Sequence, residues 1–134
     1  MKKSIIRKGN FSIEAVRDLV FKYLFVKKAD IEVDGCLVKA NSDRYKTFFV
    51  KGTSCCKCGL EATHFVLEQC PMPKRYSMPD NRFHFNLYGM KDGKEVLFTK
   101  DHILPKSKGG KNILSNYVPM CKPCNTEKGN KVEE

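Results

Sequence analysis

The sequence predicts an α+β fold stapled by a metal ion, on three observations. Residues 12–28 place apolar side chains at three- and four-residue steps, as an amphipathic helix does. Several later segments alternate apolar and polar residues, which is typical of half-buried strands. Two C-x2-C pairs, Cys55/Cys58 and Cys121/Cys124, lie 63 positions apart (121 minus 58). Since the chain has only 134 residues, these pairs predict a small fold held together by zinc.

The helix over 12–28 is predicted to begin after Ser12, whose hydroxyl can cap the first turn. Glu14 suits the positive N-terminal end of a helix, and Lys27 and Lys28 suit the C-terminal end. One apolar face would consist of Ile13, Val16, Val20, Tyr23 and Leu24. We expect this face to pack in the core.

Short antiparallel strands are predicted over 31–39, 45–50, 64–69, 82–88 and 95–103, with turns at 41–43 and 89–93. After a flexible basic loop over 105–110, the chain would return through 116–119 and end in a helix starting near Pro123. These elements suggest two regions, a basic helix-plus-strand region over 1–52 and a zinc-stapled domain over 53–134. His64 and His84 are interpreted as strand residues rather than ligands.

The charge of the chain favours nucleic acid as a partner. Lys and Arg outnumber Asp and Glu by 25 to 15, a formal net charge of +10, and cationic surfaces gain affinity by releasing counterions from a phosphate backbone. The alternative is a basic protein without such a partner. The longest apolar run, 19–26, contains Lys22 and is too short to span a bilayer, and no signal-peptide core follows Met1. We therefore expect a soluble, cytoplasmic protein.

The cysteine count supports metal binding over disulfides. Seven cysteines, an odd number, without a secretory signal argue against a disulfide framework. Four thiolates around one ion leave no open coordination position, so this zinc would be structural. Gly59 allows the tight turn that a zinc knuckle needs. The alternative is four buried or free cysteines. Cys36, Cys56 and Cys70 receive no role, although Cys56 could compete for the metal.

Four features follow one another near the end of the sequence: the Asp101-His102 pair, the P-x-S-x-G-G loop at 105–110, Asn116 and the C-x2-C-N-x2-K-G-N ending at 121–130. In this order they resemble the HNH endonuclease family. The resemblance extends over about 55–131 and is densest over 99–131. It implies a treble-clef ββα-metal core, in the branch whose last motif residue is Asn. Small HNH proteins of this kind resemble phage-borne and mobile-element nucleases, which suggests a host cytoplasm.

The residues themselves suit phosphodiester hydrolysis, which needs a base to activate water and a cation to neutralise charge. His102 is the candidate general base, and Asp101 and Asn125 are the candidate ligands of a divalent cation. Oxygen ligands favour Mg²⁺ or Mn²⁺. The resemblance implies that Asn116 holds the His102 ring in its tautomer. Because neighbouring residues on a strand face opposite ways, we expect a bulge or twist at Asp101 and His102.

The sequence departs from the fuller family pattern at Gly129, where some members carry a further His, so the catalytic metal would have few protein ligands. Phosphate contacts are predicted for five basic residues: Lys106, Lys108, Lys111, Lys128 and Lys131. The alternative is that the loop is merely solvated.

The predicted function is therefore metal-dependent hydrolysis of DNA, with double-stranded DNA as the expected substrate. The enzyme would contain a structural zinc and a catalytic Mg²⁺ or Mn²⁺. Two alternatives remain. One is a zinc-binding DNA module without catalysis, whose signature would be loss of His102 or Asp101, both of which are present. The other is an RNA-directed nuclease.

Overall fold

The computed structural model describes residues 6–69 and 83–129 of the chain. Cys70 and Lys131 lie outside these described residues. The strands are β1 (Ile6–Ser12), β2 (Asp30–Val33), β3 (Cys36–Lys39), β4 (Ala62–Gln69), β5 (His84–Lys91), β6 (Lys94–His102) and β7 (Tyr117–Cys121). The helices are α1 (Ile13–Val20), α2 (Asp43–Lys51) and α3 (Lys122–Lys128), with 3-10 turns η1 (Phe21–Tyr23), η2 (Lys106–Lys108) and η3 (Leu114–Asn116).

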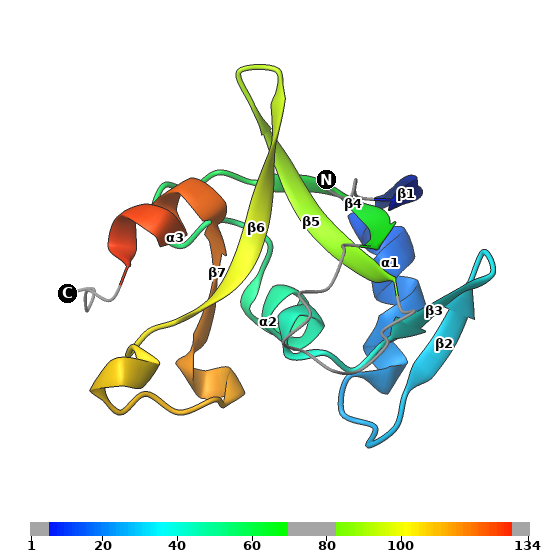
Figure 1. Ribbon diagram of the computed structural model, residues 1–134, viewed down its shortest axis with the longest axis horizontal. Coiled ribbons are helices and arrows are strands. Elements are labelled where there is room, and N and C mark those ends of the chain that lie inside the picture. The colour runs from blue at the N-terminus through cyan, green and yellow to red at the C-terminus, as the bar shows by residue number, and fades with distance from the viewer. Residues whose placement is uncertain (1–5, 70–82, 130–134) are drawn as a thin grey trace, which may run out of the picture.

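Five strands form one antiparallel sheet in the order β1-β4-β5-β6-β7, and β2 and β3 form a separate hairpin. The long β5–β6 hairpin projects at the top of Figure 1, and β6 runs from its tip to the loop that carries η2 and η3. The mixed α and β content and the antiparallel strands confirm the sequence prediction at that level. The treble-clef arrangement remains a prediction.

The core lies between the inner face of the sheet and the helices of the first third of the chain. Val16 and Val20 of α1 are fully buried, as the apolar spacing predicted. The Ser12 hydroxyl accepts a hydrogen bond from the Ala15 amide at 3.0 Å, which confirms the predicted cap. The helix is shorter than expected, because α1 ends at Val20 and continues only as η1. Among the described residues, no helix is long and apolar enough to cross a membrane.

The prediction of a strand over 45–50 is wrong, because this segment lies in α2. Aromatic and β-branched residues favour a strand locally, but two other features favour the helix. Ser42 caps it by accepting from the Tyr45 amide, and Gly52 ends it with a φ of 119°. Tyr45 and Phe48, three residues apart, are 1% and 2% exposed, so they form the buried stripe of a helix.

Residues 31–39 are likewise not one strand but the β2–β3 hairpin, turned at Asp34 and Gly35 with positive φ at both. Strand β1, which was not predicted, pairs with β4 from Ile6↔Gln69 to Ser12↔His64. Strand β1 of the basic region over 1–52 thus belongs to the same sheet as the strands of the region over 53–134.

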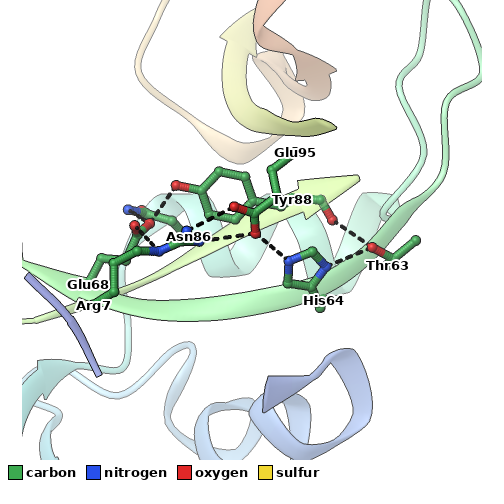
Figure 2. A network of polar contacts seen from close by, with 7 residues as sticks. All are labelled: Arg7, Thr63, His64, Glu68, Asn86, Tyr88 and Glu95. Atoms are coloured by element: carbon green, nitrogen blue, oxygen red, sulfur yellow. Dashed lines mark hydrogen bonds and ion pairs between the residues drawn. The ribbon is translucent and has the colours of Figure 1, made fainter. Parts of the chain in front are cut away.

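The outer face of the sheet carries a polar network, drawn in Figure 2. Glu68, only 1% exposed, pairs with the Arg7 guanidinium at 3.0 Å and accepts a hydrogen bond from Asn86 at 3.0 Å. Glu95 pairs with Arg7 at 2.9 Å and with His64 at 2.8 Å. Hydrogen bonding to Arg7, and then to His64, lowers the pKa of Glu95. His64 is therefore engaged in a network that ties β1, β4, β5 and β6 together.

Candidate metal centres and active site

The four cysteines of the C-x2-C pairs meet in one cluster. Their sulfur atoms all lie within 4.8 Å of one another, and the Cys58 and Cys121 sulfurs are 3.7 Å apart. Zinc–sulfur bonds of about 2.3 Å place the sulfurs of a tetrahedral site about 3.8 Å apart. The cluster therefore fits a tetrahedral ion after small side-chain adjustments.

The backbone around the first pair has the form of a knuckle that donates hydrogen bonds to sulfur. The Lys57 and Cys58 amides point to the Cys55 sulfur at 3.4 and 3.5 Å. Gly59 then turns the chain with a φ of 79°, as predicted from its position after the pair. The Cys56 amide donates to the Pro119 carbonyl at 3.0 Å, which attaches this knuckle to β7.

The electrostatics of the cluster favour a bound cation. Burial opposes ionisation of Cys55, but the amides of Cys58, Cys121 and Lys57 together outweigh it and lower the pKa of this thiol to about 6. Burial first, and then the neighbouring thiols, raise the pKa of Cys124. Four thiolates packed this closely also repel one another, so a divalent cation at the centre favours their deprotonation.

The second pair brackets the start of α3, because Cys121 is its N-cap and Cys124 lies in its first turn. Asn125 follows directly, and its amide nitrogen donates to the Thr99 hydroxyl of β6 at 2.9 Å. The amide oxygen of Asn125 is then the atom left for a metal. Thr99 and Asp101 are two residues apart and so share the face of β6 that packs against α3.

Asp101 supplies the carboxylate on this face. Its side chain is 14% exposed, and among the described residues its buried Oδ2 accepts no hydrogen bond but forms an ion pair with the Lys128 ammonium at 3.3 Å. This carboxylate and the Asn125 amide oxygen on α3, whose first turn holds Cys124, are oxygen donors of the kind that a hard divalent cation prefers. The residues thus fit such an ion.

Lys128 occupies the same region and was not expected there. Its side chain is 1% exposed, and its ammonium lies 3.3 Å from Asp101 Oδ2 and donates to the His102 carbonyl at 2.8 Å. The predicted role of Lys128 as a surface phosphate contact is therefore corrected. It is an internal counter-charge of Asp101, because α3 turns this position toward β6.

His102 is the last residue of β6, and its ring lies on the other face. The β6–β7 register runs without a shift from Phe98↔Cys121 to His102↔Tyr117, so the expected bulge is not formed. The ring makes an edge contact with Tyr117, at 5.2 Å between centroids, and Nε2 lies 2.8 Å from Asn112 Oδ1. If Asn112 accepts from Nε2–H, Nδ1 is the nitrogen that can take a proton.

The structure places Lys128 beside Asp101, and Asn125 beside Thr99 on the same face of β6, with the His102 ring across the strand from them. Among the described hydrogen bonds none joins Asn116 to this ring, which differs from the role expected for it. Its amide instead bonds the backbone of Leu104 at 2.9 and 3.1 Å and the Lys111 carbonyl at 2.9 Å. The physical reason is that Asn116 lies at the mouth of the loop, where both backbone segments are within reach.

The loop over 104–112 is therefore fixed at its base rather than freely flexible. Gly110 adds to this closure, because a Cβ there would lie 1.8 Å from the Leu104 carbonyl oxygen. Lys106, Lys108 and Lys111 are exposed on this loop, as phosphate contacts would need. Sequence reasoning missed Asn112, Thr99 and Tyr117. Thr99 could have been found from the sequence, because it lies two residues before Asp101 and so shares its strand face. The approach of Asn112 to His102 depends on the loop path and is not visible in the sequence.

Replacing Lys128 with methionine is expected to leave the Asp101 carboxylate buried beside an apolar chain, at a cost of about 3–5 kcal/mol of unfolding free energy. Added Mn²⁺ should restore part of this loss by taking over the neutralising role. Thermal unfolding of the zinc-loaded protein with and without Mn²⁺ measures both effects. Lys122→Met, at an exposed position of the same helix, is the matched control. Equal midpoints for both variants would contradict the role of Lys128.

The family model described as HNH endonuclease matches residues 88–134, from the end of β5 through α3. This match contains Asp101, His102, Asn116, Asn125 and the second cysteine pair. No curated protein and no solved structure matches the chain.

Proposed function

We propose, from the match of residues 88–134 to the family model described as HNH endonuclease, that this protein is a metal-dependent endonuclease that hydrolyses DNA phosphodiester bonds. The observation that carries the proposal is the buried Asp101 carboxylate on the face of β6 that packs against α3, the helix that carries Asn125 and begins inside the cysteine cluster. We propose that zinc occupies that cluster and that Asp101 and Asn125 hold Mg²⁺ or Mn²⁺.

In the proposed reaction, His102 accepts a proton from water at Nδ1 while the water oxygen bonds to phosphorus. The bond from phosphorus to the leaving sugar oxygen breaks, and that oxygen takes a proton from solvent. A divalent cation bound there would neutralise charge on the phosphate and on the leaving oxygen. Asn112 orients the ring, and Asn116 acts indirectly by closing the loop that carries Asn112.

The position of the His102 ring across β6 from Asp101 requires the scissile phosphate to lie at the end of this strand, where both faces are within reach. His102 is the last residue of β6, which supports such a placement. Contacts of this kind commonly tighten only when substrate is bound. The exposed Lys106, Lys108 and Lys111 lie in the loop that follows and are proposed to contact the DNA backbone.

A plasmid-nicking assay tests this function directly. Zinc-loaded protein is expected to relax supercoiled plasmid with Mg²⁺ or Mn²⁺ and to be inactive when those ions are omitted. Single-stranded DNA and a structured RNA serve as parallel substrates. Binding without cleavage of any substrate across several metals would favour a non-catalytic zinc module. Cleavage of RNA alone would replace the substrate class.

A further inference from the structure

A basic pocket opens beside the candidate active site, and its lining residues other than Lys100 lie outside the residues that the family model matches. It has a volume of about 480 Å³ and lies between the end of β3, the start of α2 and β6. Its lining contains four cationic side chains and one carboxylate, which leaves an excess of three positive charges (4 − 1 = 3). The charged lining residues are Lys39, Arg44, Lys46, Lys100 and Asp43.

The positive charge of this pocket is not cancelled from within. Asp43 is 3.6 Å from the Lys46 ammonium, and it is the only acidic side chain among the described residues that line the pocket. Arg44 donates to the neutral amide oxygen of Asn86 at 3.0 Å, and the Lys100 ammonium lies 4.2 Å from the centroid of the Tyr117 ring. Neutral partners hold these two cations in place and leave their charge available to an anion.

The pocket and the candidate base meet at one side chain, Tyr117. Its ring contacts His102 at 5.2 Å between centroids and lies under Lys100. Lys100 and His102 are two residues apart on β6 and so face the same side of the sheet. Burial, and then the Asp43 carboxylate to which it hydrogen-bonds, raise the pKa of the Tyr117 hydroxyl. Tyr117 thus connects His102 to the start of α2, which lies beside β6 and β7 in Figure 1.

We propose that this pocket, formed by Lys39, Arg44, Lys46 and Lys100, binds a backbone phosphate of the DNA strand next to the scissile bond. The proposal rests on the proposed function for its substrate class, and it assigns a role to the region over 1–52. A phosphate here needs no contact with base edges, so the pocket would position DNA without reading its sequence. Because Lys100 and His102 share one face of β6, the DNA strand would run along this face from the pocket to His102.

The experiment compares two double variants that remove the same charge. Lys46→Gln/Lys100→Gln alters the pocket, and Lys91→Gln/Lys94→Gln alters the exposed tip of the β5–β6 hairpin at the other end of β6. Binding of a fluorescent 20-base-pair duplex is measured by anisotropy over a series of NaCl concentrations, with zinc-loaded protein and without Mg²⁺ or Mn²⁺. Lys39→Gln, at an exposed strand end, is a third variant chosen to leave the fold undisturbed.

The pocket double variant is expected to bind at least tenfold more weakly than the wild type. Its slope of log affinity against log salt should fall by about 0.9 for each lysine that neutralises a phosphate. Lys39→Gln should shift both quantities in the same direction by a smaller amount, and the hairpin variant should match the wild type. The proposal would be overturned if Lys39→Gln had the affinity and salt slope of the wild type and the two double variants were weakened to the same extent. Preferential displacement of the DNA by an RNA duplex of the same sequence would also overturn it.

This test is separate from that of the proposed function. If wild-type protein binds DNA through the pocket but never cleaves it, the endonuclease proposal fails and the pocket stands. If it cleaves plasmid while the pocket double variant binds as the hairpin variant does, the pocket proposal fails and the function stands.

Discussion

Replacing His102 with alanine is expected to reduce plasmid nicking by about 10²- to 10⁴-fold, the contribution usual for a positioned general base. The variant should bind duplex DNA as the wild type does, because the ring contacts Tyr117 and Asn112 and is not part of the basic pocket. Rates are measured with excess enzyme over supercoiled plasmid at fixed Mg²⁺. Added imidazole should recover part of the lost rate, since it can occupy the vacated space and accept the proton.

The matched control is His64→Gln. It removes the imidazole of β4 that pairs with Glu95 on the outer face of the sheet, where a glutamine amide can still bond that carboxylate (Figure 2). We expect nicking by this variant to remain within a few-fold of the wild type. If His102→Ala nicks as fast as the wild type, His102 has no part in proton transfer. An intermediate variant, Asn112→Ala, should slow nicking less than His102→Ala, because it disturbs only the orientation of the ring.

The cysteine cluster was predictable from the sequence because the C-x2-C spacing by itself determines how the two sulfurs of a pair can be placed. Two residues between cysteines allow both sulfurs to face one ion, and Gly59 supplies the required turn. The cap at Ser12 was predictable for the same reason, since the donor and the acceptor lie three residues apart. Local chemistry of this kind is visible in the sequence without knowledge of the fold.

The parts that the sequence did not predict depend on contacts between distant residues. Residues 45–50 have strand-like composition, and their helix is decided by packing of Tyr45 and Phe48 in the core. Lys128 looked like a surface residue because a lysine near a helix end is normally solvated. Only the approach of α3 to β6 places its ammonium beside Asp101. Asn116 kept its position in the motif, but its partners follow from the loop path between His102 and Tyr117.

Replacing Cys124 with serine is expected to release the metal and unfold the region around α3. Ligation of zinc by four thiolates contributes on the order of 10 kcal/mol to folding, which is comparable with the whole stability of a domain of this size. The loss should be seen as zinc content near zero, measured by a colorimetric chelator after desalting, and as a large fall in the thermal midpoint. Cys56→Ser is the control, because Cys56 is an exposed neighbour of the cluster and not one of its four ligands.

The effect should extend to the candidate active site, because Cys124 and Asn125 are adjacent on α3. Without the ion, the helix loses the anchor that holds Asn125 against Thr99 and Lys128 against Asp101. Cys124→Ser should therefore lose nicking at temperatures where Cys56→Ser keeps it. The control also decides whether Cys56 competes as a ligand: if Cys56→Ser lost its zinc while Cys124→Ser retained it, the metal would be held by a different set of sulfurs. Retention of zinc and of the wild-type midpoint by Cys124→Ser would show that the cluster holds no structural ion.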